Sequence, residues 1–252
     1  QNRLVYYTAE KLAAKWTDGL IVINQEDFQN GKKLGFTEDE SLFFVHGVGV
    51  SLKQYNVNRS FNIREKLGIK NSDVVITFIA ELNRNKNHMF LLKNWENILQ
   101  HVPDVHCLIV GKGKNEEALR QYVEENNLRH IHFLGFRNDI PTILSESDIA
   151  TLLSLREGLP RCLMEAMASK KPLVVTNIRG SRDLVQHGVN GFVVDIEDDC
   201  ALTDSFIKLI KDPILRQQMG QASFERIQPY RLDNVLTEME NIYSRYLSLA
   251  NK

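Results

Sequence analysis

No hydrophobic run in this sequence of 252 residues reaches the roughly 18 residues that a membrane-spanning helix needs. An excess of charge of one sign is also missing, because 31 Lys and Arg residues face 32 Asp and Glu residues. The formal net charge of -1 argues against a nucleic-acid surface as the main partner, since such surfaces are strongly basic. We therefore expect neither a membrane span nor a nucleic-acid partner.

Cysteines and metal-binding motifs are scarce as well. Cys107, Cys162 and Cys200 are odd in number, widely spaced and without metal-ligand spacing. The seven histidines form no HExxH pattern, and no GxGxxG segment follows an apolar run, which argues against a nicotinamide-dependent oxidoreductase. We expect no metal, no organic cofactor and a reducing, cytoplasmic environment.

Short apolar runs rich in β-branched residues alternate with helical patterns along most of the chain. The runs predict strands at residues 20–23, 42–45, 74–79, 105–110, 131–134, 149–153, 173–176 and 192–194. Helical patterns cover residues 26–34, 88–100, 115–126 and 232–249. Strands that are apolar on both faces and separated by helices are typical of a covered parallel sheet. The predicted fold class is α/β, a doubly wound, Rossmann-like parallel sheet.

Polar loops follow five of the predicted strands, at residues 81–87, 111–113, 135–137, 154–159 and 177–181. The carboxyl ends of parallel strands share one edge of the sheet, where such folds bind ligands. Gly111 permits a close backbone approach, and Arg84, Lys86 and Arg137 carry charge that suits phosphate. The sequence therefore predicts an anion-binding site at this edge.

The segment SLREGLPRCLMEAMA, residues 154–168, is the most informative part of the chain. Proline is favoured at the first position of a helix, so we expect a helix to begin near Pro160, with Glu157 in the loop before it. Glu165 would lie more than one turn inside, with apolar residues on nearly every other face. An ionised Glu in such a helix is costly unless something hydrogen-bonds it.

The amides of Gly158 and Leu159 lie where a helix N-terminus forms a natural anion site. An acid above that site and another beside it suit a nucleotide sugar, with phosphates on the amides and hydroxyls on the carboxylates. For Glu157 or Glu165 alone, a structural role is about equally expected, because an acid before a helix favours the helix dipole and one inside it often faces solvent.

The segments EGLP (157–160) and EAMA (165–168) match a known family pattern in wording as well as spacing. Four further segments are similar to parts of the same pattern: LIVGKG (108–113), GFRND (135–139), GSRDLV (180–185) and HGVNGF (187–192). With the paired glutamates, they resemble the retaining glycosyltransferases of family 4. The resemblance runs from about residue 17 to 246, and it implies a GT-B fold, in which two Rossmann-like domains face each other across a cleft. The donor-binding residues that we predict from it are Arg84, Lys86, Gly111, Phe136, Arg137, Glu157, Gly158, Leu159, Pro160 and Glu165.

The resemblance also implies a role for each group. Glu157, the predicted catalytic residue, would bond the hydroxyls of the transferred sugar and stabilise charge near the reacting carbon. Glu165 would hold the ribose hydroxyls, and the Gly158–Leu159 amides would support the phosphates. Lys86 would bind phosphate. Backbone around residues 136–137 would read the base.

Two departures from the family pattern are visible. Glu81 stands where the family usually has an arginine, so Arg84 is the expected substitute. The chain begins at Gln1, and residues 1–48 resemble only the last part of the family's amino-terminal acceptor domain, followed by a linker. We expect residues 49–230 to be the donor domain, and residues 231–252 to be a helix that crosses toward the missing domain.

The expected function is transfer of a hexose from a UDP-sugar to a polysaccharide or lipid-linked oligosaccharide acceptor, as in capsule and exopolysaccharide assembly. Peripheral contact with the inner face of the membrane would come through the missing domain. Two alternatives stay open: a nucleotide-sugar-binding module that is inactive alone, and a GT-B-like sugar-nucleotide epimerase. A phosphorylase would need a cofactor lysine site, which the sequence does not indicate.

Overall fold

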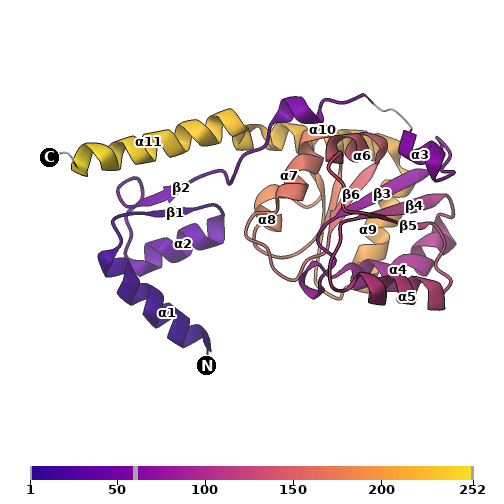
Figure 1. Cartoon of the computed structure of the whole chain (residues 1–252), viewed down its shortest axis with the longest axis horizontal. Helices are drawn as coiled ribbons and strands as arrows, with labels where there is room; N and C mark the ends of the chain where they lie inside the picture. Colours follow the sequence, from indigo (N-terminus) through magenta and orange to yellow (C-terminus); the bar gives the residue numbers. More distant parts are fainter. Residues whose placement is uncertain (1, 59–61, 251–252) are drawn as a thin grey trace. The chain divides into compact units, whose positions relative to one another are not determined.

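The computed structural model describes residues 2–58 and 62–250. The chain divides into two compact units, which we call the small unit (residues 1–49 and 229–252) and the large unit (residues 50–228). Figure 1 labels their helices and strands.

The small unit contains two short parallel strands with helices beside them. Its elements are α1 (Asn2–Ala13), η1 (Ala14–Trp16), β1 (Leu20–Val22), α2 (Gln25–Leu34), β2 (Leu42–Phe44), η4 (Gln228–Tyr230), which begins at the last residue of the large unit, and α11 (Leu232–Ala250). Asn24 caps α2 by accepting a hydrogen bond from the amide of Asp27. The Tyr246 hydroxyl of α11 donates to the Asp18 carbonyl at 2.7 Å, so the last helix packs against the segment before β1.

The large unit is built from alternating strands and helices. Its elements are η2 (Leu52–Tyr55), α3 (Asn62–Lys66), β3 (Val74–Ile79), η3 (Arg84–Lys86), α4 (His88–His101), β4 (Val105–Val110), α5 (Glu116–Glu125), β5 (Ile131–Gly135), α6 (Ile140–Glu146), β6 (Ile149–Leu152), α7 (Arg161–Ala168), β7 (Leu173–Thr176), α8 (Ser181–Leu184), β8 (Gly191–Val194), α9 (Asp199–Lys211) and α10 (Pro213–Arg226).

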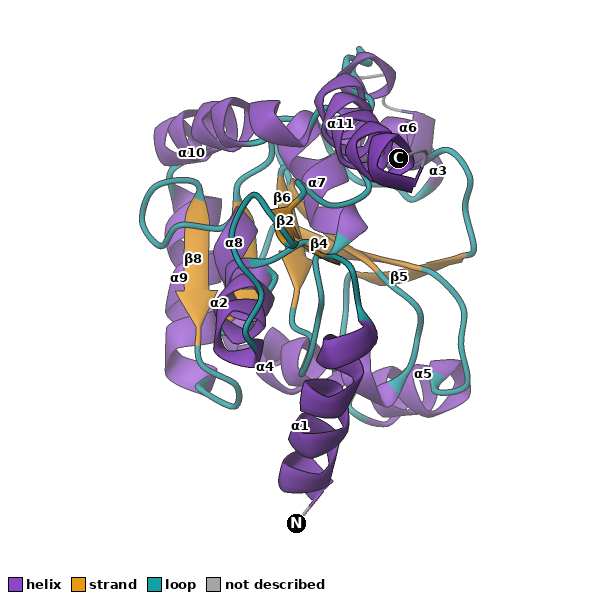
Figure 2. Ribbon diagram, turned by 90° about the vertical axis from the view of Figure 1, so that its left-hand side faces the viewer, coloured by secondary structure: helices purple, strands orange, loops and turns teal. Residues whose placement is uncertain are grey.

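The described strands of the large unit form a six-stranded parallel sheet in the order β5-β4-β3-β6-β7-β8. Helices lie on both of its faces (Figure 2). Val75, Leu108 and Val110 pack with Ile63 and Ile143 of α3 and α6. On the opposite face, Phe78 stacks on His88 of α4. Side chains of β3 and β4 are therefore buried on both sides, which explains their unbroken apolar sequences.

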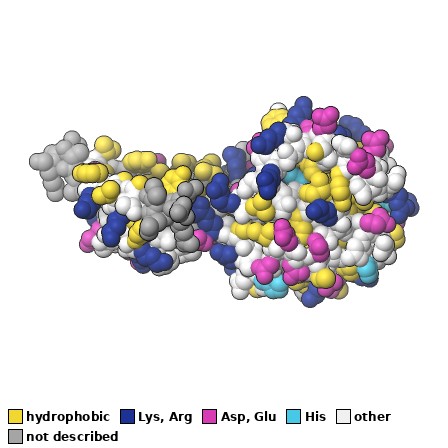
Figure 3. Space-filling model, turned by 90° about the horizontal axis from the view of Figure 1, so that it is seen from below, with side chains coloured by type: hydrophobic (Ala, Val, Ile, Leu, Met, Phe, Trp, Pro, Cys, Tyr) yellow, Lys and Arg dark blue, Asp and Glu magenta, His cyan; other side chains and the backbone are white. Residues whose placement is uncertain are grey.

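The observed fold confirms the predicted α/β class and its doubly wound parallel sheet. Every predicted strand and helix is present, with ends that differ by at most one residue. Among the helices of the large unit, α3, α6, α8, α9 and α10 were not predicted. None of the helices within the described residues is both long and apolar enough to cross a membrane. On the face of the large unit that is visible in Figure 3, basic and acidic side chains are interspersed.

Candidate functional site

The centre of the sheet is its topological switch point. The chain moves from β3 outward through β4 to β5, and from the adjacent β6 outward through β7 to β8. The loops that leave β3 and β6 therefore begin side by side, at the position where sheets of this topology bind ligands. Most of the predicted acids and cations lie on these two loops.

Three hydrogen bonds join the two central loops. The Leu155 amide donates to the Asn85 carbonyl at 2.7 Å, and the Asn85 side chain donates to the Arg156 carbonyl at 2.9 Å. Next to them, the Lys86 ammonium contacts the Glu157 carboxylate, with 2.5 Å between Nζ and Oε1. The structure thus brings together two of the residues that the sequence singled out.

The loop after β3 has a fixed shape that presents Lys86. The Asn83 side chain accepts a hydrogen bond from the Lys86 amide at 3.1 Å, which caps the short helix η3. Asn87 then adopts a left-handed conformation, with φ of 53°, before α4 begins. A non-glycine residue in this region stores strain, which is common at binding sites. Arg84 is exposed on the same short helix.

The helix α7 begins one residue after Pro160, which is its N-cap, so the sequence located this helix start closely. No side chain caps this end, and its first-turn amides are oriented as in an anion site. Glu157 lies in the loop before it, with a side chain that is 12% exposed.

Glu165 has a hydrogen-bond partner on its own helix, as its apolar surroundings demanded. Arg161 donates from Nε to Oε1 at 3.0 Å. Tyr55, in η2, is a further neighbour: burial, and then the negative charge of Glu165, raises the pKa of its hydroxyl. Sequence reasoning missed both the Arg161 contact and the nearby Tyr55. The spacing of four residues on one helix signals the Arg161 contact, whereas nothing in the sequence links Tyr55 to α7.

Glycines allow the loops to pack closely at this edge. A Cβ atom on Gly111, where φ is 144°, would lie 2.0 Å from the Ala80 carbonyl oxygen. One on Gly180 would lie 2.3 Å from the Gly158 oxygen. The predicted close approach at Gly111 is therefore between two loops of the protein, and Gly180 supports the loop that carries Glu157.

The loop after β5 exposes Phe136, whose side chain is 68% exposed. Arg137 is paired with Asp139 through two contacts, of 2.7 and 2.6 Å, and these bonds raise the pKa of Arg137 and lower the pKa of Asp139. β5 is separated from β3 by β4, so these two residues lie on a different loop from Lys86.

His88 is a buried side chain that sequence reasoning assigned no function. It is 1% exposed and stacks on Phe78 with 4.0 Å between ring centroids. Burial, and then the charge of Lys86, lowers the pKa of His88 to about 4, so the imidazole is neutral near pH 7. Neither of its ring nitrogens has a hydrogen-bond partner among the described residues.

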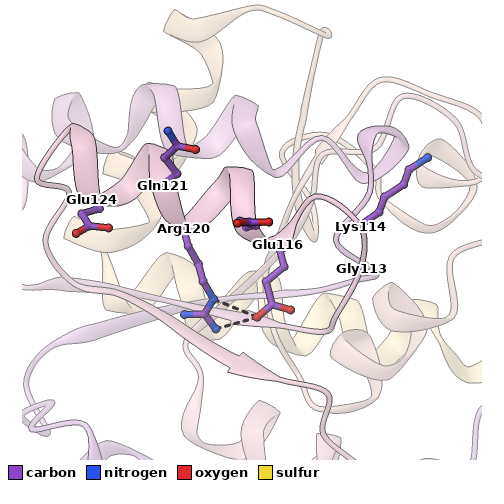
Figure 4. Close-up of a pocket in the computed structure, with 7 residues that line it drawn as sticks. Gly113, Lys114, Glu116, Arg120, Gln121 and Glu124 are labelled. Atoms are coloured by element: carbon purple, nitrogen blue, oxygen red, sulfur yellow. Dashed lines mark hydrogen bonds and ion pairs between the residues drawn. The ribbon is translucent and has the colours of Figure 1, made fainter.

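A separate hollow of about 690 Å³ lies beside α5 and is drawn in Figure 4. Of its lining side chains, Glu116, Glu117 and Glu124 are acidic, and Arg120 is held by Glu116 at 2.9 Å. This lining is unsuited to a diphosphate, and none of the predicted donor-binding residues belongs to it. Within residues 2–58 and 62–250, no three His, Cys, Asp or Glu side chains gather in a metal-binding arrangement.

Comparison with known proteins gives a consistent result. Residues 60–226 match the family model described as "Glycosyl transferases group 1". The protein EpsD of Bacillus subtilis (strain 168) is 30% identical over 100% of this chain and 67% of its own length. The UDP-Gal:alpha-D-GlcNAc-diphosphoundecaprenol alpha-1,3-galactosyltransferase of Escherichia coli is 28% identical over 98% of this chain and 65% of its own length.

Among solved structures, Anabaena HepE in complex with UDP-glucose has a TM-score of 0.80 and 23% identity, with 94% of this chain and 68% of HepE covered. At this identity the likeness supports the fold alone. The chain spans about two thirds of the length of the curated relatives named above.

Proposed function

Because the chain belongs to the glycosyl transferases group 1 family, we propose that it carries the donor-binding part of a retaining glycosyltransferase of family 4. The enzyme transfers a hexose from a UDP-sugar to a polysaccharide or lipid-linked oligosaccharide acceptor. Attack occurs on the same face of the sugar that the leaving diphosphate departs from, and the diphosphate assists it.

The Lys86–Glu157 pair at the switch point is the observation that carries this proposal. Departure of a diphosphate increases negative charge on its oxygens, and a cation beside an open helix N-terminus stabilises that charge. Lys86 provides the cation and α7 the helix terminus. Glu157, held next to Lys86, then accepts hydrogen bonds from the hydroxyls of the sugar that the phosphate carries.

The remaining predicted residues complete the donor site. Glu165 accepts hydrogen bonds from the ribose hydroxyls, and its partly buried position makes those bonds stronger than they would be in water. Backbone next to Phe136 reads the base. The exposed Arg84 takes the role of the arginine that the family usually has at the position of Glu81. It approaches the diphosphate from the same loop as Lys86.

The choice of a UDP-sugar and a lipid-linked acceptor draws on the relatives. The Escherichia coli relative is named for UDP-Gal and for a diphosphoundecaprenol acceptor, and HepE was solved with UDP-glucose. For this chain, we propose a cytoplasmic enzyme that meets its acceptor at the inner face of the membrane. We propose further that donor binding needs no metal, so chelation with EDTA should leave UDP binding unchanged.

A binding module that is inactive alone is the second candidate, because the chain spans about two thirds of its relatives. The two candidates differ in turnover. Slow hydrolysis of a UDP-sugar by this chain, abolished in Glu157→Gln, would favour a catalytic unit over a module that only binds.

Thermal unfolding with added nucleotides tests the proposed donor site. UDP at about 100 times its Kd should stabilise the chain by about 2.7 kcal/mol, because it binds the folded state alone. GDP should stabilise it less. Glu165→Gln should reduce the UDP effect, whereas Glu117→Gln on α5, outside the predicted site, should leave it unchanged. The proposal is wrong if millimolar UDP leaves the unfolding temperature of the wild-type chain unaltered.

A further inference from the structure

We propose that Asn85 is a positioning residue that ties the loop after β3 to the loop after β6, and so keeps Lys86 and Glu157 at the spacing that the donor requires. This inference rests on the proposed function, because it assigns the diphosphate to Lys86 and the sugar to Glu157. It adds a residue that contacts neither part of the donor and acts through Lys86.

Asn85 lies directly before Lys86, and its two partners are the two residues directly before Glu157. Its carbonyl oxygen accepts a hydrogen bond from the Leu155 amide at 2.7 Å, and its side-chain amide donates to the Arg156 carbonyl at 2.9 Å. The backbone bond alone joins the loops at one point, around which they can still turn. The side-chain bond adds a second point one residue further along, and two points together fix the register of Lys86 against Glu157.

Asparagine occurs at three alternate positions of the loop after β3, and each has a different role. The Asn83 side chain accepts a hydrogen bond from the Lys86 amide at 3.1 Å, and Asn87 turns the backbone with a φ of 53°. Both act within the loop and give it its shape. The Asn85 side chain instead reaches the neighbouring loop, so it determines where the shaped loop lies relative to Glu157.

The ion pair of Lys86 with Glu157 is unsuited to hold the two loops together in the donor complex. The two side chains are 21% and 12% exposed, and a diphosphate that reaches the ammonium competes with the carboxylate for it. Lysine is also a flexible stem with three rotatable donors. The hydrogen bonds of Asn85 join neutral groups, so they do not depend on where the Lys86 charge is directed. They therefore keep the loops in register while Lys86 exchanges Glu157 for phosphate.

Titration calorimetry with UDP, together with displacement of UDP by uridine, tests this role. Asn85→Ala removes the side-chain bond and leaves the backbone bond in place. We expect it to weaken UDP binding about fivefold, which corresponds to the net contribution of a typical intramolecular hydrogen bond. Uridine binding should not change, because uridine has no phosphate for Lys86 to hold.

Asn126→Ala is the matched control. The Asn126 side chain also donates to a backbone carbonyl, that of Tyr122 at 2.8 Å, but it does so at the end of α5. Its removal should affect neither ligand. Thermal unfolding without ligand checks that both variants are folded.

Equal weakening of UDP and uridine by Asn85→Ala would show a merely structural role and overturn the inference. So would unchanged binding of both. As a second measurement, Asn85→Ala should cause no additional loss of UDP affinity in a Lys86→Met background, and a further fivefold loss there would also refute the coupling. If the wild-type chain binds no UDP, the proposed function itself fails; if it binds UDP and Asn85→Ala has no effect, only the inference fails.

Discussion

Gly180 offers a sharp test of how the loop that carries Glu157 is supported. The residue has a φ of 75°, a backbone conformation that residues other than glycine rarely adopt. A Cβ atom there would lie 2.3 Å from the carbonyl oxygen of Gly158 and 3.3 Å from the Cα of Leu159. Gly180→Ala must therefore push the Gly158 loop and the start of α8 apart.

The loss of folding stability in Gly180→Ala has two parts, which a matched variant separates. Positive φ costs an alanine about 1–2 kcal/mol, and forcing extra atoms into a packed contact costs about 1–3 kcal/mol. Gly188 has a φ of 77° but has no atom within 4 Å of its would-be Cβ. Gly188→Ala should therefore show only the cost of the positive φ. Gly180→Ala should be less stable than Gly188→Ala by about 1–3 kcal/mol, because it also carries the cost of the packing clash.

Urea unfolding measures the stability of both variants, and calorimetry with UDP measures the consequence for the site. Displacement of the Gly158 loop should weaken UDP binding about tenfold in Gly180→Ala, because small misplacements of binding groups are costly. Gly188→Ala should bind UDP like the wild-type chain. Equal stability and equal UDP affinity of the two variants would refute the idea that Gly180 sets the position of this loop.

Two further predictions concern stability. Arg64 is 1% exposed and contacts Asp148 at 2.6 Å, so Arg64→Leu should cost about 3–5 kcal/mol in urea unfolding, the range for breaking a buried ion pair; a loss below about 1 kcal/mol would contradict this. The pKa of His88 is lowered from 6.5 to about 4 by folding, so the unfolded chain takes up its proton first as pH falls. The stability that His88 contributes is complete above pH 6.5 and should decline by up to about 3 kcal/mol between pH 6.5 and 4. His88→Leu should make the decline smaller, and an unchanged pH profile in that variant would count against the prediction.

The strands were predictable because burial on both faces leaves an unbroken apolar signature. β3 and β4 match the predicted ends at both termini, and their positions fixed which loops share an edge. The start of α7 was predictable because Pro160 marks it. By contrast, α10 was not predicted, because its polar and apolar residues follow no clear period. Asp212 and Pro213 at its start are nevertheless a recognisable signal of a helix N-terminus.

Contacts between side chains were less predictable than the elements that carry them. The sequence indicated that Lys86 and Glu157 belong to one edge. Their direct pairing accompanies hydrogen bonds between the two loops, such as the one from the Leu155 amide to the Asn85 carbonyl, which no local pattern specified. The sequence also indicated that Glu165 needs a partner. Arg161, four residues earlier on the same helix, supplies one, whereas the nearness of Tyr55 follows only from the packing of η2 on α7.

A crystal structure of this chain with UDP would test the proposed donor site most directly. The predicted result is a diphosphate at the N-terminus of α7, within hydrogen-bond distance of the Lys86 ammonium, with the ribose hydroxyls on Glu165. UDP bound in the hollow beside α5, or at any place where its phosphates do not reach Lys86, would contradict the assignment of the site.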